Sequence, residues 1–299
     1  MPAERRLLAI VLRLLAALAL TLMFAIVKLV DARGVSLVES LFYRQAFAMP
    51  LVLGWLAAGP RWAALKTKRP GAHVTRTLLG MAGMALNFMT FLLLPLAEAT
   101  VLLFTVPLFA TILSATLLKE KVGMHRWGAV LLGFAGVLMV VQPGGSTMSP
   151  IGVAVGLCAA TVVSAVSITL RQIGRTESAV TTVFWFTSLS ALGLALAMPF
   201  VGQAHDAVTF ALLIGLGVLG GLAQIALTAS LRLAPISVVL PMDYSNLLWS
   251  ALFGWLIFST LPSTSLWLGA PLIIASGLYI VYRENRLQRE KTAVAGPAD

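Results

Sequence analysis

The sequence predicts an all-α integral membrane protein with ten transmembrane helices. Of its 299 residues, 59% are hydrophobic and only 11% are charged, whereas about 25% of an ordinary soluble domain is charged. The apolar residues form ten long stretches joined by short connections. Glycine and amide positions of the first half recur at a fixed distance in the second half. A water-soluble fold is excluded, because it would not hide so much apolar surface.

The first half contains five stretches that approach the roughly 20 apolar residues needed to cross a bilayer. Arg5 and Arg6 precede the first stretch as in a signal peptide, but the apolar run continues well beyond the usual signal-peptide core. We therefore expect a retained span there. The five predicted helices are Leu7 to Val30, Leu37 to Ala57, Val74 to Leu94, Thr100 to Leu118 and Trp127 to Val141.

A Pro-Gly-Gly-Ser segment then interrupts the apolar pattern, and such residues are typical of a connection between helices. Five further helices are predicted at Pro150 to Leu170, Ala179 to Phe200, Val208 to Ser230, Ser237 to Phe258 and Leu266 to Tyr282. We therefore expect two halves of five helices each, residues 1–145 and residues 146–299, the second ending in a basic cytoplasmic tail.

The distribution of positive charge predicts the orientation. Lysine and arginine favour cytoplasmic loops, and with the N-terminus inside, all but three of the 21 Lys and Arg residues fall on that side. The exceptions are Lys28, Arg33 and Arg44. Both termini are thus predicted to be cytoplasmic. This topology also accounts for the formal charge of +10, so the expected partners are the lipid bilayer and a small-molecule substrate, with no nucleic acid.

An internal repeat relates the two halves. Matching positions lie 137 residues apart: Gly80, Gly83 and Asn87 recur as Gly217, Gly220 and Gln224. A second set lies 141 residues apart: Gly128 and Gly136 recur as Gly269 and Gly277. Because five spans per half is an odd number, the second half must cross the membrane in the opposite direction. Inverted repeats are typical of secondary transporters, with the substrate site near the midplane; chance glycine matches are the competing explanation.

Several short motifs carry a family resemblance. They are Glu98-Ala99-Thr100 with Pro107-Leu108, the helix end Leu117-Leu118-Lys119-Glu120-Lys121, and Trp127-Gly128 with Gly133, Gly136 and Val137. They resemble the EamA repeat of the drug/metabolite transporter superfamily, over residues 10 to 285. The resemblance implies a ten-helix carrier of two inverted repeats in the bacterial inner membrane, usually an exporter of amino acids, metabolites or drugs. Within the superfamily, the chain is similar to the bacterial aromatic amino acid exporters.

The second half departs from the EamA pattern at the end of the ninth stretch. The resemblance implies a glutamate there, whereas this sequence has Phe258-Ser259-Thr260. The departure leaves the predicted fold unchanged but weakens any role for Glu120 in symmetric gating.

The predicted function is export of small organic solutes, including aromatic amino acids, by alternating access. The alternatives are an exporter of other metabolites or drugs, a passive facilitator of the same fold, and, from another class, a membrane-embedded transferase. A transferase would need clustered reactive side chains, whereas His73, His125 and His205 fall in separate predicted loops. No GxxxxGK[ST] loop is present for ATP. We expect no catalytic residue, metal or cofactor, and the sequence is compatible with a monomer.

Ionisable residues within the predicted spans are functional candidates, because a charge at the bilayer centre costs at least about 2.5–3.5 kcal/mol. Lys28 and Glu39 lie at similar depth near the outer ends of their spans, and we expect them to form a structural ion pair. Arg44 is deeper and suits a carboxylate substrate or an acidic partner. Asp243 is the candidate for coupling to protons, with hydrogen bonding to neighbouring helices as the alternative. We do not expect it to pair with Arg44, since their depths differ by about 10 Å.

Amide and aromatic side chains are the candidates for a central substrate cavity. The symmetric pair Asn87 and Gln224 suits its polar floor, and interhelical hydrogen bonding is an equal alternative. Aromatic walls suit an apolar or aromatic solute, although each ring also suits a lipid-facing position. The aromatic candidates are Tyr43, Phe88, Phe91, Phe104, Trp185, Tyr244 and Trp249. Pro107 and Pro241 lie inside the fourth and ninth spans and are the hinge candidates.

Overall fold

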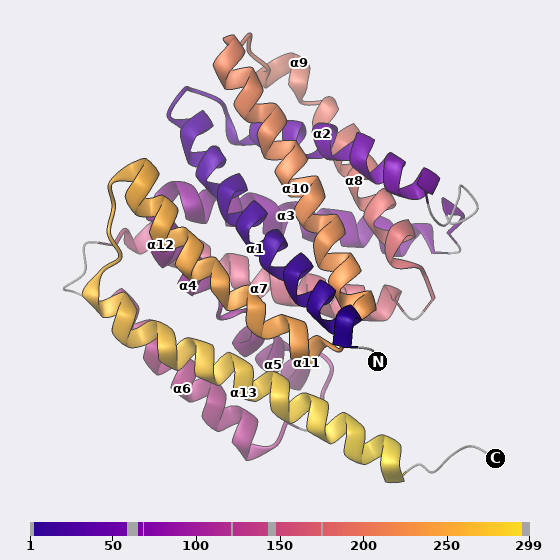
Figure 1. The fold of residues 1–299 in the computed structure, drawn as a ribbon, viewed down its shortest axis with the longest axis vertical. Helices are drawn as coiled ribbons and strands as arrows, with labels where there is room; N and C mark the ends of the chain where they lie inside the picture. The colour runs from indigo at the N-terminus through magenta and orange to yellow at the C-terminus, as the bar shows by residue number, and fades with distance from the viewer. Residues whose placement is uncertain are drawn as a thin grey trace.

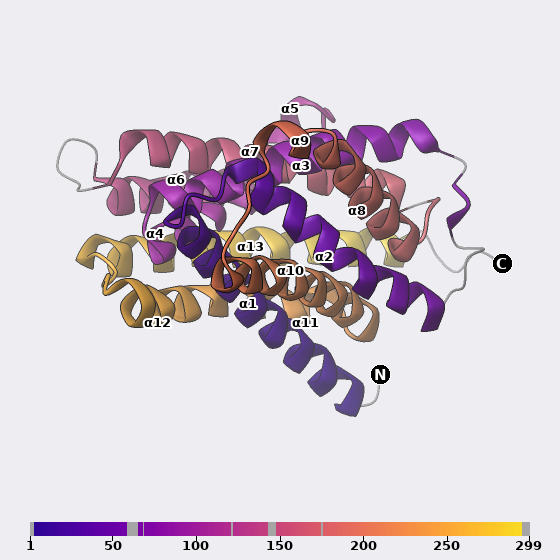
Figure 2. The same cartoon turned by 90° about the horizontal axis from the view of Figure 1, so that it is seen from above.

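Helices make up the regular structure of the described residues (Figure 1). The computed structural model describes residues 3–58, 65–67, 69–120, 122–142, 148–174 and 176–294. The expected boundary between the halves, at residues 145 and 146, lies outside these ranges. In Figures 1 and 2 the N-terminal end of α1 and the C-terminal end of α13 lie on the same side of the bundle.

The first half forms six helices from its five predicted spans. They are α1 (Ala3–Asp31), α2 (Leu37–Ala58), α3 (Pro70–Leu93), α4 (Leu96–Leu103), α5 (Val106–Thr116) and α6 (Met124–Val141). The third helix begins at Pro70, before the expected Val74, because proline fits the first position of a helix, where no intrahelical N–H bond is required. The fourth span is divided between α4 and α5.

The second half is more interrupted than the sequence predicts. Its helices are α7 (Pro150–Ile173), α8 (Ala179–Ala195), α9 (Met198–Val201), α10 (Ala207–Leu233), α11 (Ile236–Val239), the 3₁₀ helix η2 (Leu240–Tyr244), α12 (Ser245–Phe258) and α13 (Thr264–Val294). The expected seventh span is therefore α8 plus a short turn of helix. The expected ninth span is a chain of three short elements.

Within the described residues, eight helical segments are long and apolar enough to cross a membrane. They are Arg5–Asp31, Leu37–Ala58, Pro70–Leu93, Leu96–Thr116, Met124–Val141, Pro150–Ile173, Ala207–Leu233 and Thr264–Arg283. The apolar helix Ala179–Ala195 is one residue short of the 18-residue length required of a span, and α12 has 14 residues. The seventh and ninth expected spans are thus the two that are absent from these eight segments.

A proline lies at each break in the bundle. Pro107 occupies the first turn of α5, just after the break at Phe104 and Thr105, and Pro241 lies in η2. Proline has no N–H to donate, so the preceding turn has free carbonyl oxygens. At the first break the Thr105 hydroxyl donates to the Leu102 carbonyl at 2.5 Å, and the Ser164 hydroxyl donates to the Val106 carbonyl at 2.8 Å. Side chains therefore add hydrogen bonds to backbone carbonyl groups at this break.

The two broken segments also end in the same backbone conformation. Lys119, after α5, and Ser259, after α12, both have a left-handed φ of 53°. At each end an N–H donates to a carbonyl oxygen six residues earlier, from Glu120 to Ser114 at 3.1 Å and from Thr260 to Gly254 at 3.0 Å. The second half therefore repeats this turn although it lacks the glutamate.

Helices from opposite halves pack against each other. The main neighbours are α1 with α10, α6 with α13, α3 with α7, and α2 with α10 and α8, and Figure 1 shows α6 beside α13. Where α6 crosses α13, a Cβ on Gly136 would lie 2.8 Å from the Gly269 carbonyl oxygen, and a Cβ on Gly269 would lie 2.5 Å from that of Gly136. Glycine is thus required on both sides of this crossing.

Candidate functional site

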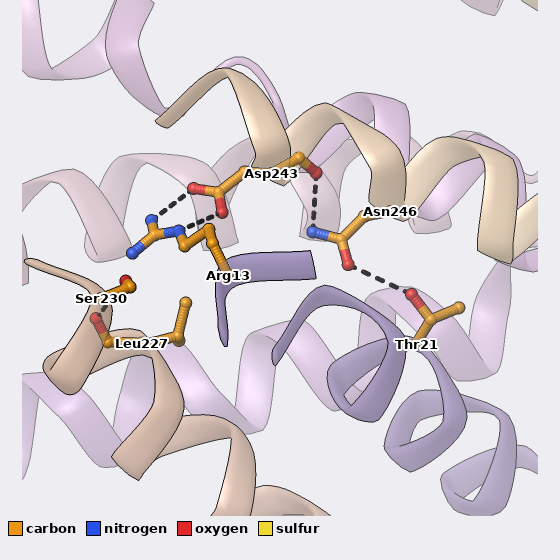
Figure 3. A network of polar contacts seen from close by, with 6 residues as sticks. All are labelled: Arg13, Thr21, Leu227, Ser230, Asp243 and Asn246. Atoms are coloured by element: carbon orange, nitrogen blue, oxygen red, sulfur yellow. Dashed lines mark hydrogen bonds and ion pairs between the residues drawn. The ribbon is translucent and has the colours of Figure 1, made fainter. Parts of the chain in front are cut away.

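An ion pair connects α1 to the broken ninth segment (Figure 3). Arg13 Nε and Nη2 donate to the two carboxylate oxygens of Asp243, each at 2.5 Å. The Arg13 side chain is 10% exposed and the Asp243 side chain 30% exposed. The bidentate geometry neutralises both charges and fixes their relative orientation. Asp243, the coupling candidate, thus has an arginine partner, which is Arg13 and not Arg44.

The pair extends into a short polar network around η2. The Asn246 amide donates to the Asp243 carbonyl at 2.8 Å, and the Thr21 hydroxyl lies 3.1 Å from the Asn246 side-chain oxygen. The Ser230 hydroxyl donates to the Leu227 carbonyl at the nearby end of α10 (Figure 3). The charge distribution places Arg13 with the cytoplasmic charges, so it is not among the predicted site residues. Its position inside the first apolar stretch is the feature that could have identified it.

The two broken segments touch each other directly. The hydroxyl oxygens of Thr100, on α4, and Ser250, on α12, are 2.7 Å apart. The rings of Phe104 and Tyr244 meet edge to face at 4.9 Å between centroids. Pro107 lies on the same side, because a Cβ on Gly277 of α13 would lie 2.5 Å from Tyr244 Oη and 3.7 Å from Pro107 Cγ. Three predicted site residues, Phe104, Tyr244 and Pro107, are therefore brought together.

Two other candidates have buried polar atoms without partners. The Asn87 side-chain oxygen and the Trp249 indole nitrogen are buried, and neither has a hydrogen-bond partner within the described structure. The Trp249 ring stacks on Phe253 at 6.4 Å. Gln224, the predicted repeat partner of Asn87, is half-buried on α10. A buried amide or indole without a partner is uncommon in a folded protein and is available to bind a solute.

The remaining aromatic candidates lie at three different helix contacts. Phe88 and Phe91 are buried and pack on Phe24 of α1, with centroid distances of 6.0 and 3.9 Å. Tyr43 stacks on its neighbour Phe47 at 5.8 Å, where α2 meets α10. The Trp185 indole donates to the Leu65 carbonyl at 3.0 Å. These side chains are committed to packing or to a loop, and the structure does not gather them around one point.

The expected ion pair between Lys28 and Glu39 is wrong. The Lys28 amine donates to the carbonyl oxygens of Phe91 and Leu94, at 2.5 and 3.0 Å, because the end of α3 has carbonyl groups without helical partners. Glu39 accepts from the His205 ring at 3.0 Å and from two backbone N–H groups, of Ser36 and Gln203. Each residue therefore connects a helix end to another part of the chain.

The histidines also lie differently from the expectation of three loops. His73 is buried in the first turns of α3, His125 lies in the first turn of α6, and His205 binds Glu39. In the described part of the chain, no group of three or more His, Cys, Asp or Glu residues has an arrangement that would hold a metal ion.

Comparison with known proteins gives a consistent result. Residues 7–142 match the EamA-like transporter family. The chain is 32% identical over 257 residues to a riboflavin transporter of Vibrio cholerae, covering 84% of each chain. It is 29% identical to an S-adenosylmethionine uptake transporter of Rickettsia felis, covering 76% of this chain and 77% of the relative.

The fold also matches a solved crystal structure. That structure has a TM-score of 0.60 and 20% sequence identity, and the match covers 96% of this chain and 99% of the other. At that identity the likeness concerns the fold alone. The family match and the relatives show that this chain is a small-molecule transporter rather than an enzyme, and that it belongs to the EamA-like transporter family of the drug/metabolite transporter superfamily.

Proposed function

We propose that this protein is a secondary transporter that moves a small organic solute by alternating access around the broken segments α4/α5 and α11/η2/α12. The single observation that carries the proposal is the contact between these two segments, through Thr100 and Ser250 and through Phe104 and Tyr244. In secondary transporters, discontinuous helices at the repeat interface form the substrate site. Pro107 and Pro241 would then act as hinges.

Reciprocal contacts support the inverted repeat. A Cβ on Gly80 of α3 would meet Phe186 of α8, and a Cβ on Gly217 of α10 would meet Phe47 of α2. Glycines at matching places in the two halves therefore accept aromatic side chains from matching helices of the opposite half. The shared turn at Lys119 and Ser259 adds a third correspondence. Ten spans, in two repeats of residues 1–145 and 146–299, explain these correspondences.

The repeat and the charge distribution support one orientation. An even number of spans places both termini on one side, and the excess of Lys and Arg places that side in the cytoplasm. Glu39 and His205, which bind each other, then both lie at the outer face. We therefore infer a location in the bacterial inner membrane, with both termini cytoplasmic.

The names of the relatives favour a solute with a fused heteroaromatic ring. Riboflavin and S-adenosylmethionine, the solutes in those names, both contain a nitrogen heterocycle joined to a polyhydroxylated chain or sugar. Phe104, Tyr244 and Trp249 supply rings on which such a solute stacks, and Asn87 supplies an unused acceptor. The branch of aromatic amino acid exporters is not confirmed, because these relatives have other names.

The test is uptake of labelled riboflavin and S-adenosylmethionine into liposomes that contain the purified protein. Labelled phenylalanine and tryptophan are measured in the same way as the alternative substrates. We expect saturable uptake of a heterocyclic solute and faster uptake when unlabelled solute is present inside, since exchange is a property of carriers. Uptake without saturation or exchange would indicate a passive facilitator. Saturable uptake of the amino acids alone would refute the proposed substrate class.

An imposed pH gradient tests the coupling role of Asp243 in the same liposomes. We expect the gradient to change the initial rate, and the Asp243→Asn variant to lose this response. Proton binding by Asp243 requires its ion pair with Arg13 to open. A response to the gradient that depends on Asp243 would therefore involve this ion pair. An unchanged response in Asp243→Asn would assign the residue a structural role.

A further inference from the structure

Two arginine side chains in one part of the bundle have buried donors without partners. Arg44 lies on α2 and Arg76 on α3. The ion pairs found among the described residues involve neither of them. Buried nitrogen atoms of both side chains lack any hydrogen-bond acceptor. A guanidinium group has five N–H donors and no acceptor, so only an electron-rich group can satisfy it.

The Arg44 guanidinium is enclosed by three helices. The residue is only 8% exposed, and its Nη1 donates to Gln45 Oε1 at 2.7 Å. Its Nε has no acceptor. A Cβ on Gly220 of α10 would lie 3.0 Å from this nitrogen and 3.1 Å from Met23 Sδ of α1. The Nε–H group of this side chain is therefore buried without an acceptor.

Arg76 also has buried N–H groups without an acceptor. Its side chain lies over Gly80, where a Cβ would meet Nη1. The guanidinium carbon is 4.3 Å from the centroid of the Phe186 ring on α8. Stacking on an aromatic ring occupies the face of a guanidinium and leaves its in-plane N–H groups available. Two of these nitrogens, Nε and Nη1, are buried without an acceptor.

A contact between α2 and α3 connects the surroundings of the two arginines. Gln45, which accepts from Arg44, contacts Met81 of α3, with 3.9 Å between its Nε2 and the Met81 sulfur. Met81 directly follows the glycine on which Arg76 lies. Like charges in the same low-dielectric part of the bundle repel each other. The hydroxyl of Thr77, next to Arg76, is also buried without a partner.

We propose that Arg44 and Arg76 together bind an anionic group of a small solute, a carboxylate or a phosphate. Buried guanidinium donors without acceptors are unfavourable unless an anion neutralises them. Planar N–H pairs match the two oxygens of a carboxylate or phosphate. Both guanidinium groups have N–H donors that the protein leaves without an acceptor.

This assignment deepens the proposed function and rests on it, since it makes the anion part of the transported solute. S-adenosylmethionine carries a carboxylate, whereas riboflavin carries no acidic group. Flavin mononucleotide is riboflavin with a phosphate added. We therefore expect flavin mononucleotide, which has the acidic group, to bind more tightly than riboflavin, which has the same ring without it.

The test measures thermal unfolding of the full-length protein in a maltoside detergent, which contains no phosphate. Inorganic phosphate and acetate are titrated at constant ionic strength against a zwitterionic buffer. We expect the unfolding midpoint to rise with the logarithm of the anion concentration, because a ligand of the folded state stabilises it by mass action. Flavin fluorescence then compares flavin mononucleotide with riboflavin.

Arg44→Gln and Arg76→Gln are the test variants, and Arg232→Gln, at an exposed position of α10, is the matched control. Each test variant should weaken the apparent affinity for the anion about tenfold or more, as expected for loss of a charge-assisted hydrogen bond. Without anion, each should unfold at a higher temperature than the wild type, because one of two repelling charges is gone. A merely structural arginine would give the opposite shift.

Three results would overturn the assignment. One is an unfolding midpoint that does not respond to phosphate or acetate in the wild type. Another is an equal response in the two test variants and the control. The third is stabilisation by phosphatidylglycerol but not by the free anions, which would assign the arginines to a lipid headgroup. Because the readout is binding, absence of transport in liposomes would refute the proposed function without deciding this site.

Discussion

At the scale of single residues, the polar groups in the bundle fall into two kinds. Arg13, Asp243, Lys28 and Glu39 all have partners, which come from distant parts of the chain. Arg44, Asn87 and Trp249 have buried atoms without partners. In an apolar surrounding a paired group stabilises one conformation, whereas an unpaired group lowers the free energy when a solute binds. The second kind is therefore where we look for substrate contacts.

The first prediction concerns the Arg13 and Asp243 pair. Asp243→Asn keeps the shape of the side chain but removes its charge, which leaves the largely buried Arg13 without a counter-ion. We expect a loss of about 1.5–3 kcal/mol in the free energy of unfolding, the usual worth of a hydrogen bond to a charged group. Thermal unfolding in detergent measures it.

The control is the double variant Arg13→Gln with Asp243→Asn. Since both charges are then absent, it should recover part of the lost stability relative to Asp243→Asn alone. A double variant that is less stable than either single variant would show that the two residues do not act as a pair.

The second prediction concerns the amide pair of the repeat. Asn87→Ala should slow transport about fivefold, which corresponds to one hydrogen bond of about 1 kcal/mol to the solute. Gln224→Ala should have a similar effect, because it holds the matching place in the other half. Initial uptake rates, divided by the amount of folded protein in the liposomes, measure both. Normal rates in both variants would show that the amides only pack between helices.

At the scale of secondary structure elements, the apolar stretches predicted most of the helices and the prolines predicted the breaks. The stretch Ser237 to Phe258 was expected as one helix, but a 3₁₀ turn interrupts it at Leu240–Tyr244. Apolar composition alone does not distinguish a 3₁₀ turn from a continuous α-helix, since it does not specify the backbone hydrogen-bond pattern. Pro241 was the local signal, and its effect extended over the whole turn.

The third prediction concerns the crossing of α6 and α13. Gly269→Ala would place a Cβ 2.5 Å from the Gly136 carbonyl oxygen, and this backbone atom cannot move without separating the helices. We expect a loss of about 1–3 kcal/mol in the free energy of unfolding, as for other overpacked sites. Gly128→Ala on α6 is the matched control, because nothing lies within 4 Å of its Cβ position. Equal effects of the two substitutions would contradict the required close approach.

At the scale of the whole molecule, the proposed topology rests on the charge distribution and on a predicted odd number of spans per half. The membrane class could be predicted from the sequence, because apolar composition decides it. The network around η2 could not, because the partners Arg13 and Asp243 are 230 residues apart. The aromatic candidates were identified by expected depth alone, and depth does not tell on which side of a helix a ring lies. Phe88 and Phe91, for example, have the expected depth but belong to the packed core.

The fourth prediction tests this topology with reporter fusions. A green fluorescent protein fused after Asp299 should fluoresce, because it folds in the cytoplasm, and alkaline phosphatase at the same place should be inactive. The reverse is expected for fusions after Ala204, in the connection between α9 and α10. The same reporter pattern at both places would contradict an inverted arrangement of the halves.

The position of Lys28 has a consequence for the order of assembly during synthesis. Its acceptors, the carbonyl oxygens at the end of α3, lie 63 to 66 residues further along the chain. Until the third helix has entered the bilayer, the ammonium group of Lys28 lacks its final partners. The carbonyl groups at the end of the third helix likewise lack a donor until they reach that lysine. The first and third helices therefore satisfy each other's polar groups, and a nascent chain that stops after α2 lacks the final partners of Lys28.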